Sequence, residues 1–329
     1  MQSQYGFTKY SVGEFKMWLN SITLARTVTF VQEHHTWQPN YSGFSGSNHF
    51  EMQRSMKQYH VGTNGWSDIG QHFTVFPDGA ILSGRPLANT PACIYGNNSN
   101  SICIENLGDF DAGRDAMTQA QADTIVQVTA ALLARFNLGA PNVNNIVYHH
   151  WFDLNTGART NGTGVTKSCP GTAFFGGNTV SACQANFLPL VQAALSGLPA
   201  NPVVSATGYV SVTANSLTIR TGPGTNNPVA PGVAPAELGS VLRVYGQQNG
   251  WLKISATNSH WVSGSRTVPV RPAQVNTANT NCRSGPAQTF PVVRTLQQGD
   301  RVYEYEASGG WSRVGLDESW IRSTLLTFG

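Results

Sequence analysis

The sequence predicts an α/β domain, with a mixed central sheet flanked by helices, followed by two small all-β barrels. Short apolar runs typical of strands alternate with helical patterns over residues 1–197, which predicts helices layered on a sheet. Past residue 198 the helical periodicity disappears. Short motifs then recur about sixty residues apart, which indicates two copies of one small all-β unit.

The helices of the first half are predicted from their periodicity and their ends. Residues 11–20 begin with Ser-x-x-Glu, the pattern of a capping box. Residues 118–136 carry the strongest helical pattern, which opens at Thr118. Residues 49–59 and about 185–196 have weaker patterns of the same kind. We therefore expect helices in all four places.

The strands are predicted from short apolar runs bounded by turn residues. In order, they are residues 27–31, 73–76, 80–82, 101–105 and 146–148. Residues 77–79, Pro-Asp-Gly, join the second and third as a hairpin. The first strand leads to His34 and the last to His149. Since α/β sheets usually keep their sites just past strand ends, we expect both histidines in a site.

The second half contains an internal repeat. Its three motifs recur at offsets of 63, 60 and 59 residues: 217–223 as 280–286, 250–251 as 310–311, and 261–262 as 320–321. Units of about sixty residues can fold alone as compact barrels. The predicted organisation is a first domain, a Pro-containing linker and two all-β units, at residues 1–197, 198–207, 208–270 and 271–329.

Composition excludes several classes of protein. With 11% charged and 40% hydrophobic residues among 329, the chain fits a folded protein rich in strands and turns, not disorder or a coiled coil. No run approaches about 18 apolar residues, so we expect no membrane insertion. Residues 201–329 carry ten Lys and Arg against six Asp and Glu. This mild positive charge suits binding to an anionic polymer such as a cell wall, and it is equally typical of ordinary solvent-exposed arginines. No basic, aromatic-rich stripe indicates nucleic-acid binding.

Two His pairs and a Cys-Pro-Gly turn are the residues most indicative of chemistry. His34-His35 and His149-His150 follow predicted strands, and Cys169 lies 20 residues after His149. Two imidazoles and a thiolate can hold Zn²⁺ at three corners of a tetrahedron and leave the fourth for water. Adjacent residues of a strand point to opposite faces, so only one His of each pair can face the metal. The sequence therefore indicates a metallohydrolase.

The five cysteines form no dense disulfide framework. Cys93 and Cys103 flank a loop rich in Gly, Asn and Ser. Two alternatives remain for this pair: a disulfide, or two buried free thiols.

Five segments within residues 28–177 resemble a known family, in the family's own order. They are residues 31–36, 65–70, 77–79, 84–85 and 167–171. The domain resembles a zinc-dependent N-acetylmuramoyl-L-alanine amidase of the type shared by phage amidase lysozymes and peptidoglycan recognition proteins. The resemblance covers nearly the whole first domain and implies that family's fold.

The resemblance implies a specific set of zinc ligands. In that family the first His of His-His-Thr, the His that ends the late strand and the Cys of Cys-Pro-Gly bind zinc. Here these are His34, His149 and Cys169, and alignment of residues 146–148 favours His149 over His150. Further candidate substrate contacts are His35, Asn64, Trp66, Gln71 and His150.

The chain departs from the family pattern at Gln71. Many relatives carry a Tyr there that is aimed at the zinc-bound water, and an amide cannot act as a general base. Relatives without this Tyr use a Glu at the end of a Ser-Ile-x-Ile-Glu strand, which is Glu105 here. The family's Lys two residues before the last ligand is Lys167. The resemblance thus implies that Glu105 moves a proton from zinc-activated water to the leaving amine while Lys167 stabilises the oxyanion.

The implied activity is hydrolysis of the amide between the lactyl group of N-acetylmuramic acid and L-alanine in peptidoglycan. The repeated units resemble bacterial SH3-like domains, which commonly bind wall peptides and raise the effective concentration of an enzyme at the wall. We therefore expect a monomer that acts at the bacterial cell wall. Residues 1–5 show no secretory signal, so export by a holin, a secretion system or another route is expected.

Two other functions remain open. One is a non-catalytic peptidoglycan sensor, although sensors of this fold have lost zinc ligands and all three are present here. The other is a recycling amidase that acts on soluble anhydromuropeptides, which the missing signal favours and the two wall-binding-like units oppose. A phage endolysin, an autolysin and a secreted antibacterial effector are not separated by the residues.

Overall fold

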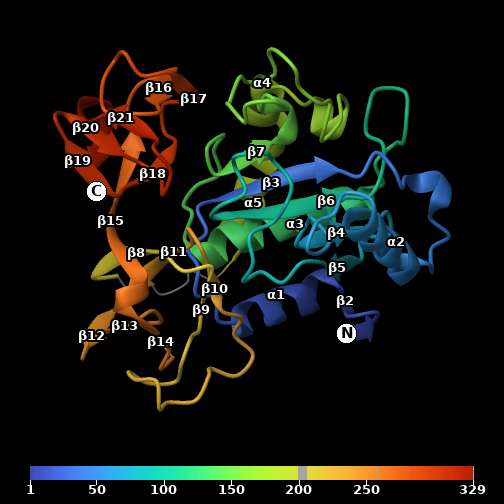
Figure 1. Ribbon diagram of the computed structural model, residues 1–329. Coiled ribbons are helices and arrows are strands. Elements are labelled where there is room, and N and C mark those ends of the chain that lie inside the picture. Colours follow the sequence, from blue (N-terminus) through green and yellow to red (C-terminus); the bar gives the residue numbers. More distant parts are fainter. Residues whose placement is uncertain (199–205, 257, 329) are drawn as a thin grey trace. The chain divides into compact units, whose positions relative to one another are not determined.

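The computed structural model describes residues 1–198, 206–256 and 258–328, which form two compact units (Figure 1). Unit 1 consists of Met1–Ile22, Val28–Asn155 and Thr160–Pro202. Unit 2 consists of Thr23–Thr27, Thr156–Arg159 and Val203–Gly329. Most of the predicted linker, residues 199–205, lies outside the described residues.

Unit 1 is built on a seven-stranded mixed sheet with the strand order β1-β2-β5-β4-β6-β3-β7. The strands are β1 (Gln2–Gln4), β2 (Phe7–Tyr10), β3 (Phe30–His35), β4 (Phe73–Val75), β5 (Ile81–Ser83), β6 (Ser101–Asn106) and β7 (Ile146–Tyr148). β6 is parallel to β4 and β3, and β3 is parallel to β7, whereas β1, β2, β5 and β4 pair antiparallel. Figure 1 shows β3 and β6 side by side within this sheet. The mixed α/β fold predicted for this half is therefore confirmed.

Two features of the sheet differ from the prediction. β3 continues to His35, so His34 lies inside the strand and not beyond an end at residue 31. The reason is that β6 pairs with β3 as far as His35, whereas β7 pairs only with residues 31–33, so the ladder with β6 continues past the apolar run. The β1–β2 hairpin is not predicted at all, because β1 is polar and exposed.

The helices of unit 1 are α1 (Val12–Ser21), α2 (His49–Gly62), α3 (Gln119–Phe136), α4 (Val180–Ala182) and α5 (Leu188–Ser196). The capping box at α1 is present as predicted: Glu14 N donates to Ser11 Oγ at 3.3 Å, and Ser11 N donates to Glu14 Oε2 at 2.9 Å. Thr118 caps α3. The predicted last helix is continuous with a π-helical turn, η4 (Cys183–Phe187), that leads from α4 into α5.

The two faces of the sheet carry different side chains. On one face Thr129 of α3 donates a hydrogen bond of 2.7 Å to the buried Glu33 carboxylate of β3. Because side chains alternate along a strand, Gln32 and His34 lie on the other face. The parallel register pairs His34 with Glu105 of β6, which places both on this second face. The central strands thus present a polar row opposite α3.

Unit 2 is made mainly of short strands. They are β8 (Gly208–Val212), β9 (Ser216–Leu217), β10 (Ala236–Glu237), β11 (Val241–Val244), β12 (Gly246–Gln248), β13 (Trp251–Lys253), β14 (Trp261–Ser263), β15 (Thr267–Val275), β16 (Thr280–Arg283), β17 (Val292–Leu296), β18 (Arg301–Glu304), β19 (Glu306–Ser308), β20 (Trp311–Arg313), β21 (Trp320–Arg322) and β22 (Leu326–Phe328). β15 crosses the predicted boundary between residues 270 and 271 and pairs with β8 before it and with β18 and β22 after it. Separate hydrophobic clusters lie on the two sides of that boundary, around Val262 and around Ile321.

The repeated arginine makes the same contact in both copies. Arg220 Nη1 donates to the Asn227 carbonyl at 2.7 Å, and Arg283 Nη1 donates to the Phe290 carbonyl at 2.8 Å. Each bond reaches a carbonyl seven residues further along the chain. The Arg-x-Gly-Pro motif therefore has a structural role in both copies.

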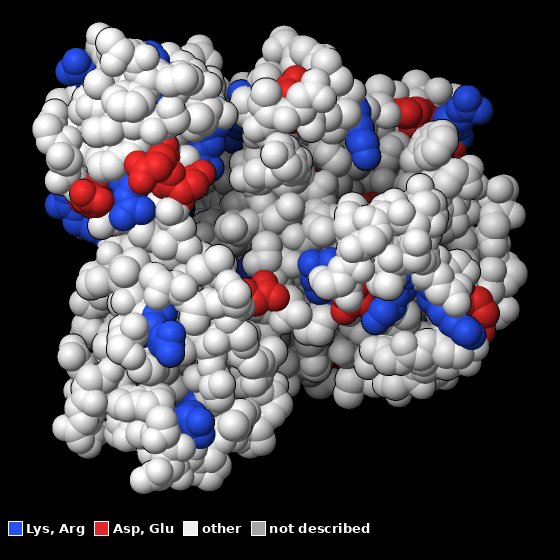
Figure 2. Space-filling view, in the orientation of Figure 1, with Lys and Arg blue, Asp and Glu red and all other residues white. Residues whose placement is uncertain are grey.

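Two observations concern the apolar helices and the surface charge. No helix in the described ranges is long and apolar enough to cross a membrane. On the face in Figure 2, acidic and basic side chains lie in small groups and leave most of the face uncharged. That face therefore carries no broad basic area.

Candidate metal centre

The structure brings together the three predicted ligands, His34, His149 and Cys169. One ligand atom from each lies within 4.8 Å of the other two. His34 Nδ1 is 3.5 Å from Cys169 Sγ, and the ring centroids of His34 and His149 are 4.9 Å apart. All three residues are buried. They come from β3, from the turn η2 (His149–Trp151) that follows β7, and from the turn that contains Cys-Pro-Gly.

Gln32 orients the His34 ring. Gln32 Nε2 donates to the Asn97 carbonyl at 2.7 Å, so Gln32 Oε1 is the atom 3.3 Å from His34 Nε2. An amide oxygen only accepts, so His34 Nε2 carries the hydrogen of the neutral ring. His34 Nδ1 then keeps its lone pair on the side of Cys169, which is the tautomer that a metal ligand needs.

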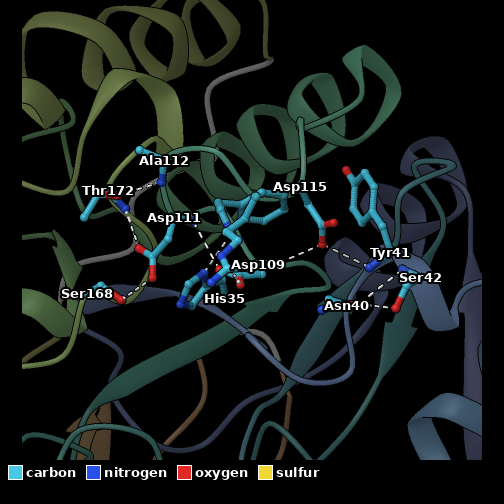
Figure 3. Close-up of polar contacts among 12 residues, drawn as sticks. His35, Asn40, Tyr41, Ser42, Asp109, Asp111, Ala112, Asp115, Ser168 and Thr172 are labelled. Carbon is cyan, nitrogen blue, oxygen red and sulfur yellow. Dashed lines mark hydrogen bonds and ion pairs between the residues drawn. The ribbon is translucent and has the colours of Figure 1, made fainter.

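Asp111 holds the turn that carries Cys169 (Figure 3). Its Oδ2 accepts a hydrogen bond of 2.8 Å from Ser168 Oγ, and its Oδ1 accepts one of 2.9 Å from Thr172 N. Thr172 Oγ1 in turn accepts from Ala112 N at 2.9 Å. The two segments are therefore joined on both sides of the cysteine.

Gly171 explains the glycine of the Cys-Pro-Gly motif. Its φ of +117° lies in a region that side chains rarely adopt. A Cβ at this position would lie 2.4 Å from the Phe110 carbonyl oxygen. The turn can pack against the 108–115 loop only because residue 171 has no side chain.

The second histidine of each pair lies outside the group of ligand atoms. His35 Nδ1 accepts a hydrogen bond of 3.1 Å from Phe110 N. His150 Nδ1 donates to the Lys167 carbonyl at 2.7 Å. Both rings thus hold loops next to the ligand group through hydrogen bonds to their backbone. That His35 and His150 contact the substrate stays a prediction.

Glu105 and Lys167 both act electrostatically on the ligand group. Glu105 Oε2 is buried and has no hydrogen-bond partner among the described residues. Burial raises the pKa of Glu105 to about 8; Lys167 opposes this shift and Glu33 adds to it. Lys167 is exposed, and its charge also acts on His149 and Cys169.

The donor set fits Zn²⁺. Burial, together with nearby positive groups, lowers the pKa of His34 well below its usual range and that of His149 to about 3, so both rings are neutral. Burial raises the pKa of the Cys169 thiol, and the Glu105 carboxylate adds to the effect. A dication at the centre would supply the positive charge that stabilises both the thiolate and the carboxylate.

The other predicted contacts lie in two places. Gln71 is buried; its Nε2 donates to Thr74 Oγ1 at 3.0 Å, and its Oε1 has no partner within the described residues. Asn64 and Trp66 follow α2, and the Trp66 ring packs on His60 with centroids 4.7 Å apart.

Two residues of the site are absent from the sequence-based prediction. Gln32 lies two positions before His34, so strand alternation alone could have placed it on the same face. Asp111 carries no such signal, because its partners lie about sixty residues further along the chain. Only the folded loop brings it to the Cys169 turn.

A buried group of two imidazoles and a thiolate, next to an unpaired carboxylate, defines a candidate hydrolytic metal centre. Residues 24–172 match the model of the N-acetylmuramoyl-L-alanine amidase family, and residues 278–327 match that of the bacterial SH3 domain. The chain therefore carries an amidase-family domain with a bacterial SH3 domain at its carboxy-terminal end.

Individual relatives carry related names. A human protein named N-acetylmuramoyl-L-alanine amidase is 27% identical over 146 residues, which are 44% of this chain and 23% of that protein. The endolysin of Escherichia phage T7 is 33% identical over 89 residues, which are 25% of this chain and 56% of the endolysin. The chain thus spans less than two thirds of the length of these relatives. The solved structure of wild-type Drosophila PGRP-LB aligns over 57% of this chain and 95% of its own, with 19% identity and a TM-score of 0.36.

Proposed function

We propose that this protein is a zinc-dependent amidase that cleaves peptidoglycan between the lactyl group of N-acetylmuramic acid and L-alanine. The observation that carries the proposal is the buried group of His34, His149 and Cys169, with the unpartnered Glu105 carboxylate on the same side of the sheet. The family matched by residues 24–172 and the names of the human and phage relatives support the same activity.

In this proposal the three ligands hold the metal, and Gln32 fixes the orientation of the His34 ring. When bound, Zn²⁺ supplies Lewis-acid activation of water and of the scissile carbonyl. His34 contributes Nδ1, because its Nε2 hydrogen is directed to Gln32. Asp111 keeps Cys169 in place through Ser168 and Thr172.

Glu105 carries the proton. Its pKa of about 8 in the metal-free protein lies close to neutral pH, so the carboxyl group can both accept and release a proton there. It accepts a proton from the attacking water and delivers it to the leaving amine of L-alanine. Gln71, at the position of the family's tyrosine, has an amide that cannot serve this purpose.

Lys167 stabilises the oxyanion that forms at the attacked carbonyl. Its charge already acts on Glu105, His149 and Cys169, which surround the reaction centre in this proposal. Loss of one such stabilising group costs about 2.7–4 kcal/mol in comparable sites.

The all-β repeats hold the enzyme at the cell wall. The bacterial SH3 domain at residues 278–327 supports this role. We extend it to residues 208–270, which share its repeated motifs. Tethering raises the local concentration of the catalytic domain without adding contacts to the site.

Mass spectrometry of the products from purified sacculi and from soluble muropeptides tests the proposal. We expect sacculi to release stem peptides with a free L-alanine amino terminus, and the Cys169→Ser variant to release none. A peptidoglycan sensor would bind sacculi and release nothing, and a recycling amidase would cleave only soluble anhydromuropeptides. Either of these results contradicts the proposal.

A further inference from the structure

The Cys93–Cys103 disulfide lies directly beside a proposed zinc ligand. Of the two alternatives for this pair, the structure shows the disulfide. Both sulfur atoms and one ring nitrogen of His34 lie within 4.8 Å of one another. His34 therefore belongs to two groups of potential ligands, one with His149 and Cys169 and one with Cys93 and Cys103.

We propose that reduction of this disulfide creates a second metal site, formed by His34, Cys93 and Cys103, which competes with the first site for His34. This inference rests on the proposed role of His34 as a zinc ligand. One imidazole and two thiolates form a donor set that suits Zn²⁺. The oxidised pair cannot bind in this way, because each sulfur is bonded to the other.

The chemistry balances with a phosphine reductant. The sulfur–sulfur bond breaks, the phosphine becomes a phosphine oxide, and water supplies the oxygen and the two protons of the new thiols. Metal binding then displaces those two protons, because thiolates are the ligands. No change of metal oxidation state is involved.

The loop closed by the disulfide also positions His34. The Asn97 carbonyl, within the loop, accepts from Gln32 Nε2, and Gln32 Oε1 accepts from His34 Nε2. This chain of contacts keeps Nδ1 directed toward Cys169. Opening the disulfide releases the loop at the same time as it frees two thiolates. Both effects favour transfer of His34 to the second site.

Co²⁺ is the probe for the test, because its absorption reports the number of bound thiolates. In the full-length oxidised protein we expect one Co²⁺ with one thiolate. After phosphine treatment the thiolate-to-metal band should grow roughly twofold, as expected for two thiolates. An unchanged band in the reduced, Co²⁺-loaded protein would overturn the proposal.

The His149→Ala/Cys169→Ser double variant isolates the second site. It should bind no Co²⁺ when oxidised and one when reduced, and further replacement of Cys93 and Cys103 by Ser should abolish this gain. A reduced double variant that binds no Co²⁺ contradicts the inference. If that variant does not fold, X-ray absorption by Co²⁺ bound to the wild-type protein tests the inference. On reduction, the protein ligands of Co²⁺ should change from one sulfur and two nitrogens to two sulfurs and one nitrogen. An oxidised wild type that binds no Co²⁺ would instead count against the first site and the proposed function.

Discussion

Glu105 occupies an unusual position for a carboxylate. It lies on the same side of the sheet as His34, and its Oε2 is buried without a hydrogen-bond partner among the described residues. Burial of an unpaired carboxylate costs stability, and the raised pKa of about 8 expresses that cost. Carboxyl groups with strongly raised pKa values are common at functional sites, which supports the role as base that we propose for Glu105.

Replacement of Glu105 separates chemistry from metal binding. We expect Glu105→Ala to lower turnover on sacculi by about 10²–10⁴-fold, because general acid–base catalysis contributes that much. The variant should keep its metal, since Glu105 is not among the ligand atoms. Turnover and metal content measured on the same sample check both parts. The exposed Glu51→Ala is the matched control, and wild-type turnover by Glu105→Ala would show that another group is the base.

In the proposed zinc site, Gln32 acts on the metal through His34. We expect Gln32→Leu to weaken zinc binding by about 10–100-fold, since the ring loses the acceptor that fixes its tautomer. Gln32→Glu keeps an acceptor oxygen and should recover much of that affinity. Competition with a chelator measures both variants. Equal affinity of Gln32→Leu and wild type would mean that the contact does not orient the ring.

At the scale of elements, the 108–115 loop and the Cys169 turn form one assembly. We expect Asp111→Ala to reduce the free energy of unfolding by about 2 kcal/mol, because hydrogen bonds to a charged group are lost from Ser168 and Thr172. Asp111→Asn keeps one acceptor and should lose less. Urea unfolding and chelator competition measure stability and zinc affinity. If both variants matched wild type in both measurements, the turn would be held by other contacts.

Some helices and strands are predictable from the sequence and others are not. Periodicity and capping predict α1 and α3 well, because those signals are local. The end of β3 at His35 depends on pairing with β6, which no local pattern reports. The β1–β2 hairpin turns at Tyr5 and Gly6, both with positive φ, and lacks the usual Asn-Gly or Asp-Gly signal.

In the candidate site, too, the ligands are predictable from local sequence motifs, whereas contacts between distant residues are not. His34, His149 and Cys169 are marked by motifs, and the structure brings them within 4.8 Å of one another. The contacts that fix Gln32 and the Cys169 turn, from Asn97 and Asp111, join residues far apart in the chain and are visible only in the folded protein. Residue types therefore predict the chemistry, while the geometry that supports it comes from tertiary structure.

At the scale of the whole molecule, buried carboxyls make stability depend on pH. Burial raises the pKa of Glu105 to about 8 and that of Glu33 to about 7, from an unfolded value of 4.5. The folded state then keeps protons that the unfolded state has lost, so stability falls as pH rises toward these values. Buried histidines such as His149, with a pKa of about 3, act in the opposite sense, because stability rises as pH passes upward through their unfolded value of 6.5.

We therefore expect Glu105 and Glu33 together to reduce the stability of the metal-free protein by about 2 kcal/mol between pH 6.5 and pH 8. Urea unfolding in the presence of a chelator measures this loss. Glu105→Gln, which cannot titrate, should remove most of it. The same pH dependence in wild type and Glu105→Gln across this window would contradict the raised pKa of Glu105.

The central claim is that His34, His149 and Cys169 together hold one Zn²⁺ on which peptidoglycan cleavage depends. Stoichiometric metal analysis of the purified protein, with turnover measured on the same sample, tests it most directly. We predict one zinc per chain, loss of metal and turnover together on chelation, and recovery of both when Zn²⁺ is added. A well-folded sample that cleaves peptidoglycan without bound metal would contradict the claim.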